Sequence, residues 1–232
     1  MTILGFDIIS DLHLDETSDF NWENKPTSLY CLVAGNISSN PSIVYKTLKH
    51  LSKCYQGVFY IDGIKEHASL TERNNVINDI TRICTSLKNV VYLHNNVVVV
   101  DGIALVGVNG WGNYPVYTDD DKFQVKASRY DDLVYLEKTV EKLQLHIDVK
   151  KIIVMSNSVP SSAMYFGETP QFDEGDVSLD IVLPVDTEQK VKYWIFGSYG
   201  KIVDIVKNNI NYISNPCYDR NPYYARRIDI EF

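Results

Sequence analysis

The sequence has little of what would mark an exported or membrane-embedded protein. Its four cysteines lie far apart, with no CxxC pair and no histidine at zinc-finger spacing, so neither a disulfide framework nor a structural zinc site is indicated. No apolar run approaches the roughly 20 residues that a membrane-spanning helix needs. The first residues also lack the basic end and cleavage site of a signal peptide. We therefore expect a cytoplasmic protein with no membrane partner and mostly buried, reduced thiols.

Positive charge is also scarce. Lysine and arginine number 22 against 30 aspartate and glutamate residues, which gives a formal net charge of −8. Such a surface repels a phosphate backbone unless the basic residues cluster, so the composition argues against a nucleic-acid ligand. Tyrosine is plentiful, at 16 residues, and it is enriched at protein interfaces as well as common in ordinary folds. The expected partner is another protein or a second copy of the chain.

Apolar segments alternate between strand-like and helix-like patterns. With 232 residues, of which 45% are hydrophobic, we interpret 1–232 as one domain. Short β-type runs occupy 3–10, 29–34, 58–61, 90–93, 97–100, 104–108, 151–155 and 193–196. Apolar residues at helical spacing predict helices from Pro41 to about 55, from Ser69 to about 87, and from Asp131 to Leu145.

Hairpin signals join two further pairs of strands. Asp101-Gly102 separates 97–100 from 104–108, and Asn208-Asn209 separates 202–206 from 210–214. The mixture of βα units with hairpins predicts a layered α/β sandwich rather than a purely doubly wound sheet. The polar stretches 112–130 and 161–180 carry acidic runs and are interpreted as surface loops.

Polar side chains follow several strands at the point where each strand ends, which is where ligands bind in open α/β sheets. The segments are Asp11-Leu12-His13, Gly35-Asn36, Asp62-Gly63-Ile64-Lys65-Glu66, Ser156-Asn157-Ser158 and Gly197-Ser198-Tyr199-Gly200. Their order and spacing resemble the motifs of calcineurin-like metallophosphoesterases: Asp-x-His, Gly-Asp, Gly-Asn-His-Glu or Asp, a lone His, and Gly-His-x-His. The resemblance covers nearly the whole chain. It implies that family's four-layer sandwich, with two mixed β-sheets flanked by helices.

The same resemblance implies that the metal site has been lost. In the family, the aspartate of the second motif bridges two divalent cations held about 3.5 to 4 Å apart, and here that position is Asn36. The metal-binding Asn aligns with Ile64, the leaving-group His with Lys65, the lone His with Asn157, and the final pair with Ser198 and Gly200. Only Asp11 and His13 keep the residue type of a metal ligand. At these eight vestigial positions we expect no catalysis and no two-metal centre.

Three functions are compatible with this degenerate site. We expect a catalytically inactive pseudoenzyme that acts as a binding or structural protein without a cofactor. One alternative is a residual phosphoesterase with a single, weakly bound divalent ion at Asp11, His13 and Asn36. Another is a non-catalytic nucleotide or phosphate sensor that uses Lys65, Asn36 and Asn157. We also expect the Lys65 ammonium to pair with Asp11 in place of a metal, although a surface position would suit a lysine equally well.

Residues outside the motifs complete these expectations. The C-terminal tail is rich in Tyr and Arg, which dominate interface hot spots, so it is a candidate partner surface that could equally pack on its own domain. Its candidate residues are Tyr218, Arg220, Tyr223, Tyr224, Arg226 and Arg227. His67 could reach the site through a shift in register, whereas His94 is interpreted as a surface or capped residue. The compact, eroded sequence also resembles small phage-encoded members of the family, which implies a host cytoplasm.

Overall fold

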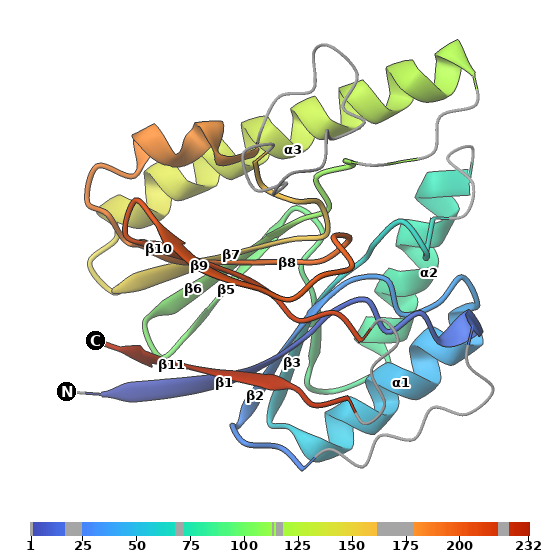
Figure 1. Ribbon diagram of the computed structural model, residues 1–232, viewed down its shortest axis with the longest axis horizontal. Helices are drawn as coiled ribbons and strands as arrows, with labels where there is room; N and C mark the ends of the chain where they lie inside the picture. Colours follow the sequence, from blue (N-terminus) through green and yellow to red (C-terminus); the bar gives the residue numbers. More distant parts are fainter. Residues whose placement is uncertain are drawn as a thin grey trace.

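Two β-sheets lie face to face with helices on both outer sides (Figure 1). The computed structural model describes residues 2–16, 25–67, 72–112, 114, 118–161, 179–217 and 223–232. The first sheet has the order β11 (Arg226–Glu231), β1 (Ile3–Ile9), β2 (Tyr30–Ala34), β3 (Gly57–Ile61), β4 (Val90–Tyr92). The second has the order β5 (Asn96–Val100), β6 (Ile103–Val108), β7 (Lys151–Ser156), β8 (Val191–Phe196), β10 (Ile210–Ser214), β9 (Val203–Lys207).

Helices form the two outer layers. α1 (Pro41–Cys54) and α2 (Arg73–Thr85) pack on the first sheet, while α3 (Asp119–Leu145) and the 3₁₀ helix η4 (Leu179–Val185) pack on the second. A short 3₁₀ turn, η1 (Leu14–Glu16), follows the first strand. The predicted four-layer α/β sandwich, with two mixed sheets flanked by helices, is confirmed.

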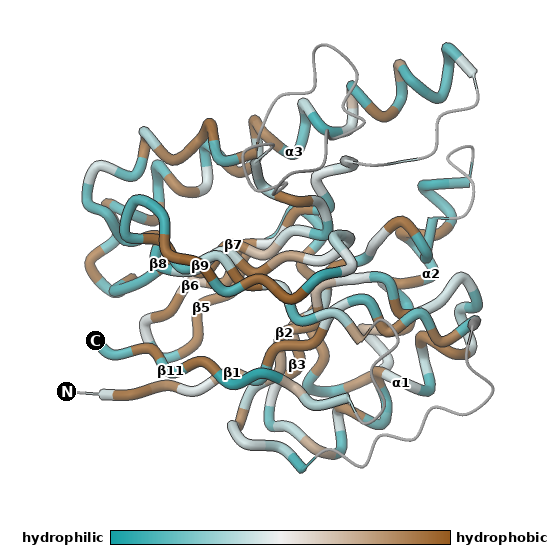
Figure 2. The backbone as a smooth tube through the Cα atoms, viewed as in Figure 1, coloured by the Kyte–Doolittle hydropathy of each residue, from teal (hydrophilic) through white to brown (hydrophobic). Residues whose placement is uncertain are grey.

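Three hydrophobic cores hold the layers together, and Figure 2 shows the corresponding hydrophobic stretches along the strands. The core between the sheets contains fully buried Leu32, Ile153 and Ile195. The outer cores contain Leu48 of α1 against the first sheet and Leu136 of α3 against the second. Fully burying one such side chain contributes about 1.5 to 3 kcal/mol, so these alternating apolar positions decide which face of each element turns inward.

Parallel strand pairing brings distant loops to one end of the molecule. β1, β2, β3 and β4 run parallel in the first sheet, and β6, β7, β8 and β10 run parallel in the second. The carboxyl ends of parallel strands meet at the same edge of a sheet. Loops separated by many residues in the sequence therefore converge there.

Both predicted hairpins are present. β5 pairs with β6 and β9 pairs with β10, each in antiparallel register. The turn residues Asp101 and Gly102 have φ angles of 48° and 85°, and Asn208 and Asn209 have φ angles of 52° and 61°. Two successive residues with positive φ form the primed turn whose twist suits a hairpin, and Asn, Asp and Gly tolerate this conformation best.

Two segments differ from the sequence-based expectation. Residues 119–130 are not a loop, because α3 begins at Asp119 with a capping box between Thr118 and Asp121. The acidic run lies in the first turn, where negative charge is favourable for a helix. The second difference is β11, whose sequence alternates charged residues with buried Ile228 and Ile230. Most of the other proposed loop, 162–178, lies outside the described residues.

Candidate functional site

The loops that carry the metallophosphoesterase-like motifs meet at the carboxyl end of the strands. A cavity of about 520 Å³ is lined by Asp11, His13, Asn36, Ser39, Ile64, Lys65, Ser198, Tyr199 and Gly200. Asn157 is fully buried, and its Oδ1 accepts a hydrogen bond of 3.3 Å from the Ile64 N–H. The structure thus brings all eight vestigial positions together, although they come from loops after β1, β2, β3, β7 and β8.

The backbone at these positions adopts an unusual conformation. φ is 51° at Asp11, 47° at His13, 59° at Asn36 and 60° at Ser198, although none of these residues is glycine. Non-glycine residues rarely occupy this left-handed region, and strained residues of this kind concentrate at functional sites. The loops therefore have a site-like backbone even where their side chains offer no metal ligand.

Two glycines allow the loops to approach one another closely. A Cβ atom added at Gly63 would lie 2.4 Å from the Asn36 Oδ1 atom, and one at Gly197 would lie 2.3 Å from the Ala34 carbonyl oxygen. Real Cβ atoms do not come so near to other heavy atoms. Glycine is needed here for close packing of the loops after β2, β3 and β8.

Both polar atoms of the Asn36 side chain form hydrogen bonds within the protein. Its Nδ2 donates a 2.7 Å hydrogen bond to Asp11 Oδ1, and its Oδ1 accepts a 3.0 Å hydrogen bond from the Lys65 backbone N–H. Asp11 Oδ1 also accepts a hydrogen bond of 2.8 Å from the Ser198 N–H. At the position where the resemblance places a metal-bridging carboxylate, a neutral side chain links three loops.

The two oxygens of the Asp11 carboxylate have different surroundings. Its Oδ2 is buried and accepts no hydrogen bond from the described residues. Burial raises the pKa of Asp11, although the hydrogen bonds from Asn36 and Ser198 and the nearby His13 oppose this shift. His13 Nε2 lies 4.0 Å from Asp11 Oδ1. The expected pairing with Lys65 is not among the contacts of this carboxylate.

Lys65 lies close enough to another carboxylate, that of Asp15, for its charge to affect the pKa of that group. Asp15 accepts hydrogen bonds from the Ser38 hydroxyl and from the Ser39 N–H, the latter at 2.8 Å. Burial opposes ionisation of Asp15, but these hydrogen bonds and the Lys65 charge together lower its pKa. Lys65 thus lines the cavity, and its charge is the smallest of the influences on the pKa of Asp15.

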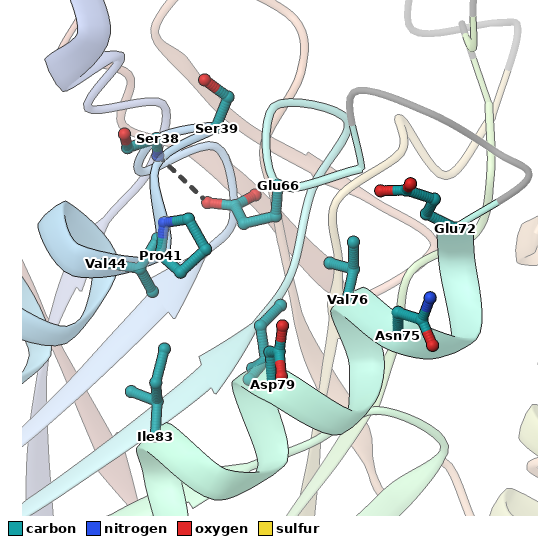
Figure 3. A pocket seen from close by; sticks show the side chains of 11 residues that line it. Ser38, Ser39, Pro41, Val44, Glu66, Glu72, Asn75, Val76, Asp79 and Ile83 are labelled. Atoms are coloured by element: carbon teal, nitrogen blue, oxygen red, sulfur yellow. Dashed lines mark hydrogen bonds between the residues drawn. The ribbon is translucent and has the colours of Figure 1, made fainter.

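Glu66 braces the loops beneath the cavity. Its two carboxylate oxygens accept N–H hydrogen bonds from Gly63 at 2.7 Å, Asn36 at 3.1 Å, Ile37 at 2.6 Å and Ser38 at 3.3 Å. Figure 3 shows the bond to Ser38 beside a separate cavity of about 280 Å³ between α1 and α2. Burial raises the pKa of Glu66, while the N–H donors favour its ionised form.

The remaining donors do not fit a two-metal centre. A pair of divalent cations needs several anionic or imidazole ligands. Asn36 and Asn157 are neutral and hydrogen-bonded, and the Ile64 side chain has no atom that can bind a metal. Among the described residues, no group of three or more His, Cys, Asp or Glu could hold a metal ion. Asp11 and His13 remain as two potential ligands for one ion.

A second buried cluster was not anticipated. Asp62, which directly follows β3, contacts His67 Nε2 and lies 3.4 Å from His94 Nδ1. Burial opposes ionisation of Asp62, but the two histidines hold its pKa well below its usual range. His94, predicted to be a surface or capped residue, is half-buried: its side chain is 19% exposed, and contact with Asp62 raises its pKa despite burial.

Strand pairing explains this cluster. β3 and β4 are parallel neighbours, so residues that follow them, such as Asp62 and His94, arrive side by side. Asp132 of α3 completes the group from the opposite side: burial raises its pKa to about 6, and it accepts a 2.7 Å hydrogen bond from the Gly110 N–H. The sequence signal was a polar residue directly after each apolar strand.

The C-terminal tail is partly integrated into the fold. The Tyr223 hydroxyl donates a 2.6 Å hydrogen bond to the Asn215 carbonyl oxygen. Arg226 pairs with Asp204, and Arg227 pairs with Asp229 at 2.8 Å. Tyr224 is 61% exposed. Tyr218 and Arg220 lie outside the described residues.

Comparison with known proteins identifies the fold but not a sequence family. No family model matches the chain, and no curated protein sequence matches it. No helix in the described part of the chain is long and apolar enough to cross a bilayer.

Several solved structures share the fold. The phosphopantetheinyl hydrolase PptH from Mycobacterium tuberculosis superposes with a TM-score of 0.59 and 12% identity, covering 96% of this chain and 95% of that one. A putative 5'-nucleotidase from Staphylococcus aureus gives a TM-score of 0.55 with 11% identity over 93% of this chain and 49% of the nucleotidase. GAP50, the anchor in the inner membrane complex of Plasmodium, gives 0.55 with 14% identity, covering 94% and 72%. The chain thus has a phosphoesterase- and nucleotidase-type fold and spans about half the length of the nucleotidase.

Proposed function

We propose that this protein is a degenerate calcineurin-like phosphoesterase that has lost two-metal catalysis and serves as a binding or structural protein. The observation that carries the proposal is the Asn36 amide, which bonds Asp11 through its nitrogen and the Lys65 N–H through its oxygen. A bridging ligand needs a negatively charged oxygen directed at both metals. Here the amide offers no charge, and both of its polar atoms are used within the protein.

The architecture supports retention of the scaffold for its surface. Glu66 accepts N–H hydrogen bonds from Ile37 and Gly63, which ties together the loops after β2 and β3. A protein with a similar fold, GAP50, is the anchor in the inner membrane complex of Plasmodium, so this architecture also occurs in a protein with an anchoring role. Fold alone does not specify activity, and the proposal rests on the site.

One observation favours a second candidate, a residual phosphoesterase with a single ion. The buried Oδ2 of Asp11 accepts no hydrogen bond from the described residues, and His13 Nε2 lies 4.0 Å from the other oxygen of this carboxylate, Oδ1. A magnesium or calcium ion completed by water could use that oxygen. Such a site would be weak, because it has one carboxylate and one imidazole, and Asn36 can add only a neutral oxygen as a third ligand.

Two measurements test the proposal. Hydrolysis of p-nitrophenyl phosphate and bis-p-nitrophenyl phosphate, with Mn²⁺, Mg²⁺, Ca²⁺ or Ni²⁺, should not exceed that of the double variant Asp11→Asn, His13→Gln. Calorimetric titration with Mn²⁺ should show no tight site. Two bound ions, or turnover that the double variant abolishes, would refute the proposal. One ion bound through Asp11 with slow turnover would establish the second candidate.

A thermal-shift experiment tests the alternative role as a sensor of phosphate or nucleotides. Phosphate and nucleotides should be added without metal and followed by thermal shift, because the Lys65 ammonium lines the cavity of about 520 Å³. Saturable stabilisation that Lys65→Ala removes, with no hydrolysis, would assign the cavity to anion binding.

A further inference from the structure

Helix α3 carries apolar side chains on two opposite faces. Its inner face packs on the second sheet through buried Leu136 and Val140. The outer face presents Phe123, which is 72% exposed, and Tyr130, which is 67% exposed. Ala127, also exposed, and half-buried Val134 lie on the same outer stripe.

The outer stripe has the spacing of a helix-pairing surface. Phe123, Ala127, Tyr130 and Val134 follow one another at steps of four, three and four residues. At about 100° per residue, these steps keep all four side chains on one narrow face, as in the seam of a two-helix coiled coil. In Figure 1, α3 forms the outermost layer, and its first half projects beyond the strands. No described element of the chain covers this half on its outer side.

We propose that this stripe binds the same stripe of a second copy, in antiparallel orientation. The twofold axis passes between residues 128 and 129. Phe123 then faces Val134 of the second copy, and Tyr130 faces Ala127. Each contact occurs twice, as an isologous interface requires. The large Tyr130 ring meets the small Ala127 side chain, so that a knob fits a hole.

Charge at one flank of the stripe supports the same register. Asp120 and Lys138 lie on the same side of the stripe. The midpoint between them along the helix, residue 129, is within half a residue of the proposed twofold axis. In an antiparallel pair related by a twofold axis, equal flanks meet, so Asp120 of each copy faces Lys138 of the other. On the opposite flank Asp119 faces Glu137, which weakens the pair. We therefore expect an association that depends on concentration and is sensitive to salt.

This inference rests on the binding role proposed above and names a partner for it. Different experimental results would refute the dimer and the proposed function. Phosphatase activity would refute the proposed function and leave the dimer untouched. A protein that stays monomeric at all concentrations would refute the dimer and leave the proposed function standing.

Sedimentation equilibrium of the full chain from about 1 to 500 µM tests the interface. We expect a monomer–dimer equilibrium that Phe123→Glu abolishes. Ile147→Glu is the matched control, because Ile147 is 81% exposed and lies outside the stripe. Circular dichroism spectra of each variant show whether α3 remains folded.

A charge swap tests the register itself. Asp120→Lys and Lys138→Asp should each raise the dissociation constant about ten-fold, because every substitution places two pairs of like charges in contact. The double variant should return to within about two-fold of the original value. A dimer that persists in Phe123→Glu, or a double variant no tighter than either single one, overturns the proposal.

Discussion

Asn36 Nδ2 donates a hydrogen bond of 2.7 Å to Asp11 Oδ1, in the interior of a site where the family resemblance places an aspartate between two metal ions. The two side chains are joined directly, and a second bond at the Asn36 Oδ1 atom holds the amide in this orientation. An amide and a carboxylate can lie together in a buried space without a cation, whereas two ionised carboxylates repel each other strongly.

The first prediction follows from this contact. Asn36→Asp replaces a donor by a second carboxylate against Asp11, and we expect a loss of about 2 to 4 kcal/mol in the free energy of unfolding at pH 7. The loss should shrink at pH 5, because the two carboxyl groups can share a proton. Urea denaturation at both pH values measures it. Asn78→Asp, at an exposed position on α2, is the control and should cost little.

Strong stabilisation of Asn36→Asp by Mn²⁺ would show that one substitution restores a metal site. In that case the loss of the other ligands would matter less than we propose.

A second prediction concerns Glu66, whose carboxylate accepts four backbone N–H bonds. Glu66→Gln turns one acceptor into an NH₂ group that faces N–H donors, and it should cost about 2 to 3 kcal/mol. Hydrogen exchange at the Ile37 and Gly63 amides should quicken. Exposed Glu72→Gln should leave both measurements unchanged. Equal effects of the two substitutions would contradict the role of Glu66 as a brace.

The third prediction is a pH dependence from the buried cluster. Burial raises the pKa of Asp132 to about 6, and contact with Asp62 raises the pKa of His94 despite burial. A raised pKa means that the folded state binds the proton more tightly than the unfolded chain does. Both groups therefore add stability as the pH falls from 7.5 to 5. Asp62, whose pKa is lowered, loses its contribution only at more acid pH.

The raised pKa of Asp132 accounts for about 1 kcal/mol of the increase in the free energy of unfolding between pH 7.5 and 5. Urea denaturation of Asp132→Asn should show a correspondingly flatter profile, while the exposed neighbour Asp131→Asn should follow the wild-type curve. A wild-type protein that is less stable at pH 5 than at pH 7.5 would contradict this assignment.

The fourth prediction compares two glycines of the site loops. An added Cβ at Gly63 would lie 2.4 Å from the Asn36 Oδ1 atom, whereas at Gly200 it would meet nothing within 4 Å. Gly200→Ala should therefore cost only about 1 kcal/mol for the left-handed backbone, with φ at 69°. Gly63→Ala should cost clearly more, because the loops after β2 and β3 must separate. Thermal unfolding of both variants measures the difference, and equal costs would show that the contact at Gly63 relaxes freely.

Much of the fold could be predicted from local sequence patterns. The apolar runs of β1, β3, β6 and β7 and the turn pairs Asp101-Gly102 and Asn208-Asn209 depend on nearby residues alone, and the structure has strands and hairpins there. The predicted start of α3, at Asp131, was wrong. The acidic run at 119–121 is the first turn of the helix, where Thr118 and Asp121 form a capping box. β11 was missed because only its pairing with β1 turns a charged, alternating segment into an edge strand.

The sequence by itself determined where the site lies and what chemistry its residues offer. The order of polar segments after successive strands located the vestigial positions, and the residue types at Asn36, Ile64 and Ser198 limited the available metal ligands. These are properties of residue identity, and no arrangement in space can give an amide the charge of a carboxylate.

Tertiary structure alone decided how the remaining polar groups are satisfied. Asp11 bonds Asn36 and Ser198 rather than Lys65, and Asp62 contacts His67 together with His94, which sequence analysis had interpreted as a surface or capped residue. Such pairings depend on which strands lie side by side and how closely the loops approach, to within fractions of an ångström. Electrostatic and hydrogen-bond energies change over that distance, and residue spacing along the chain does not specify it.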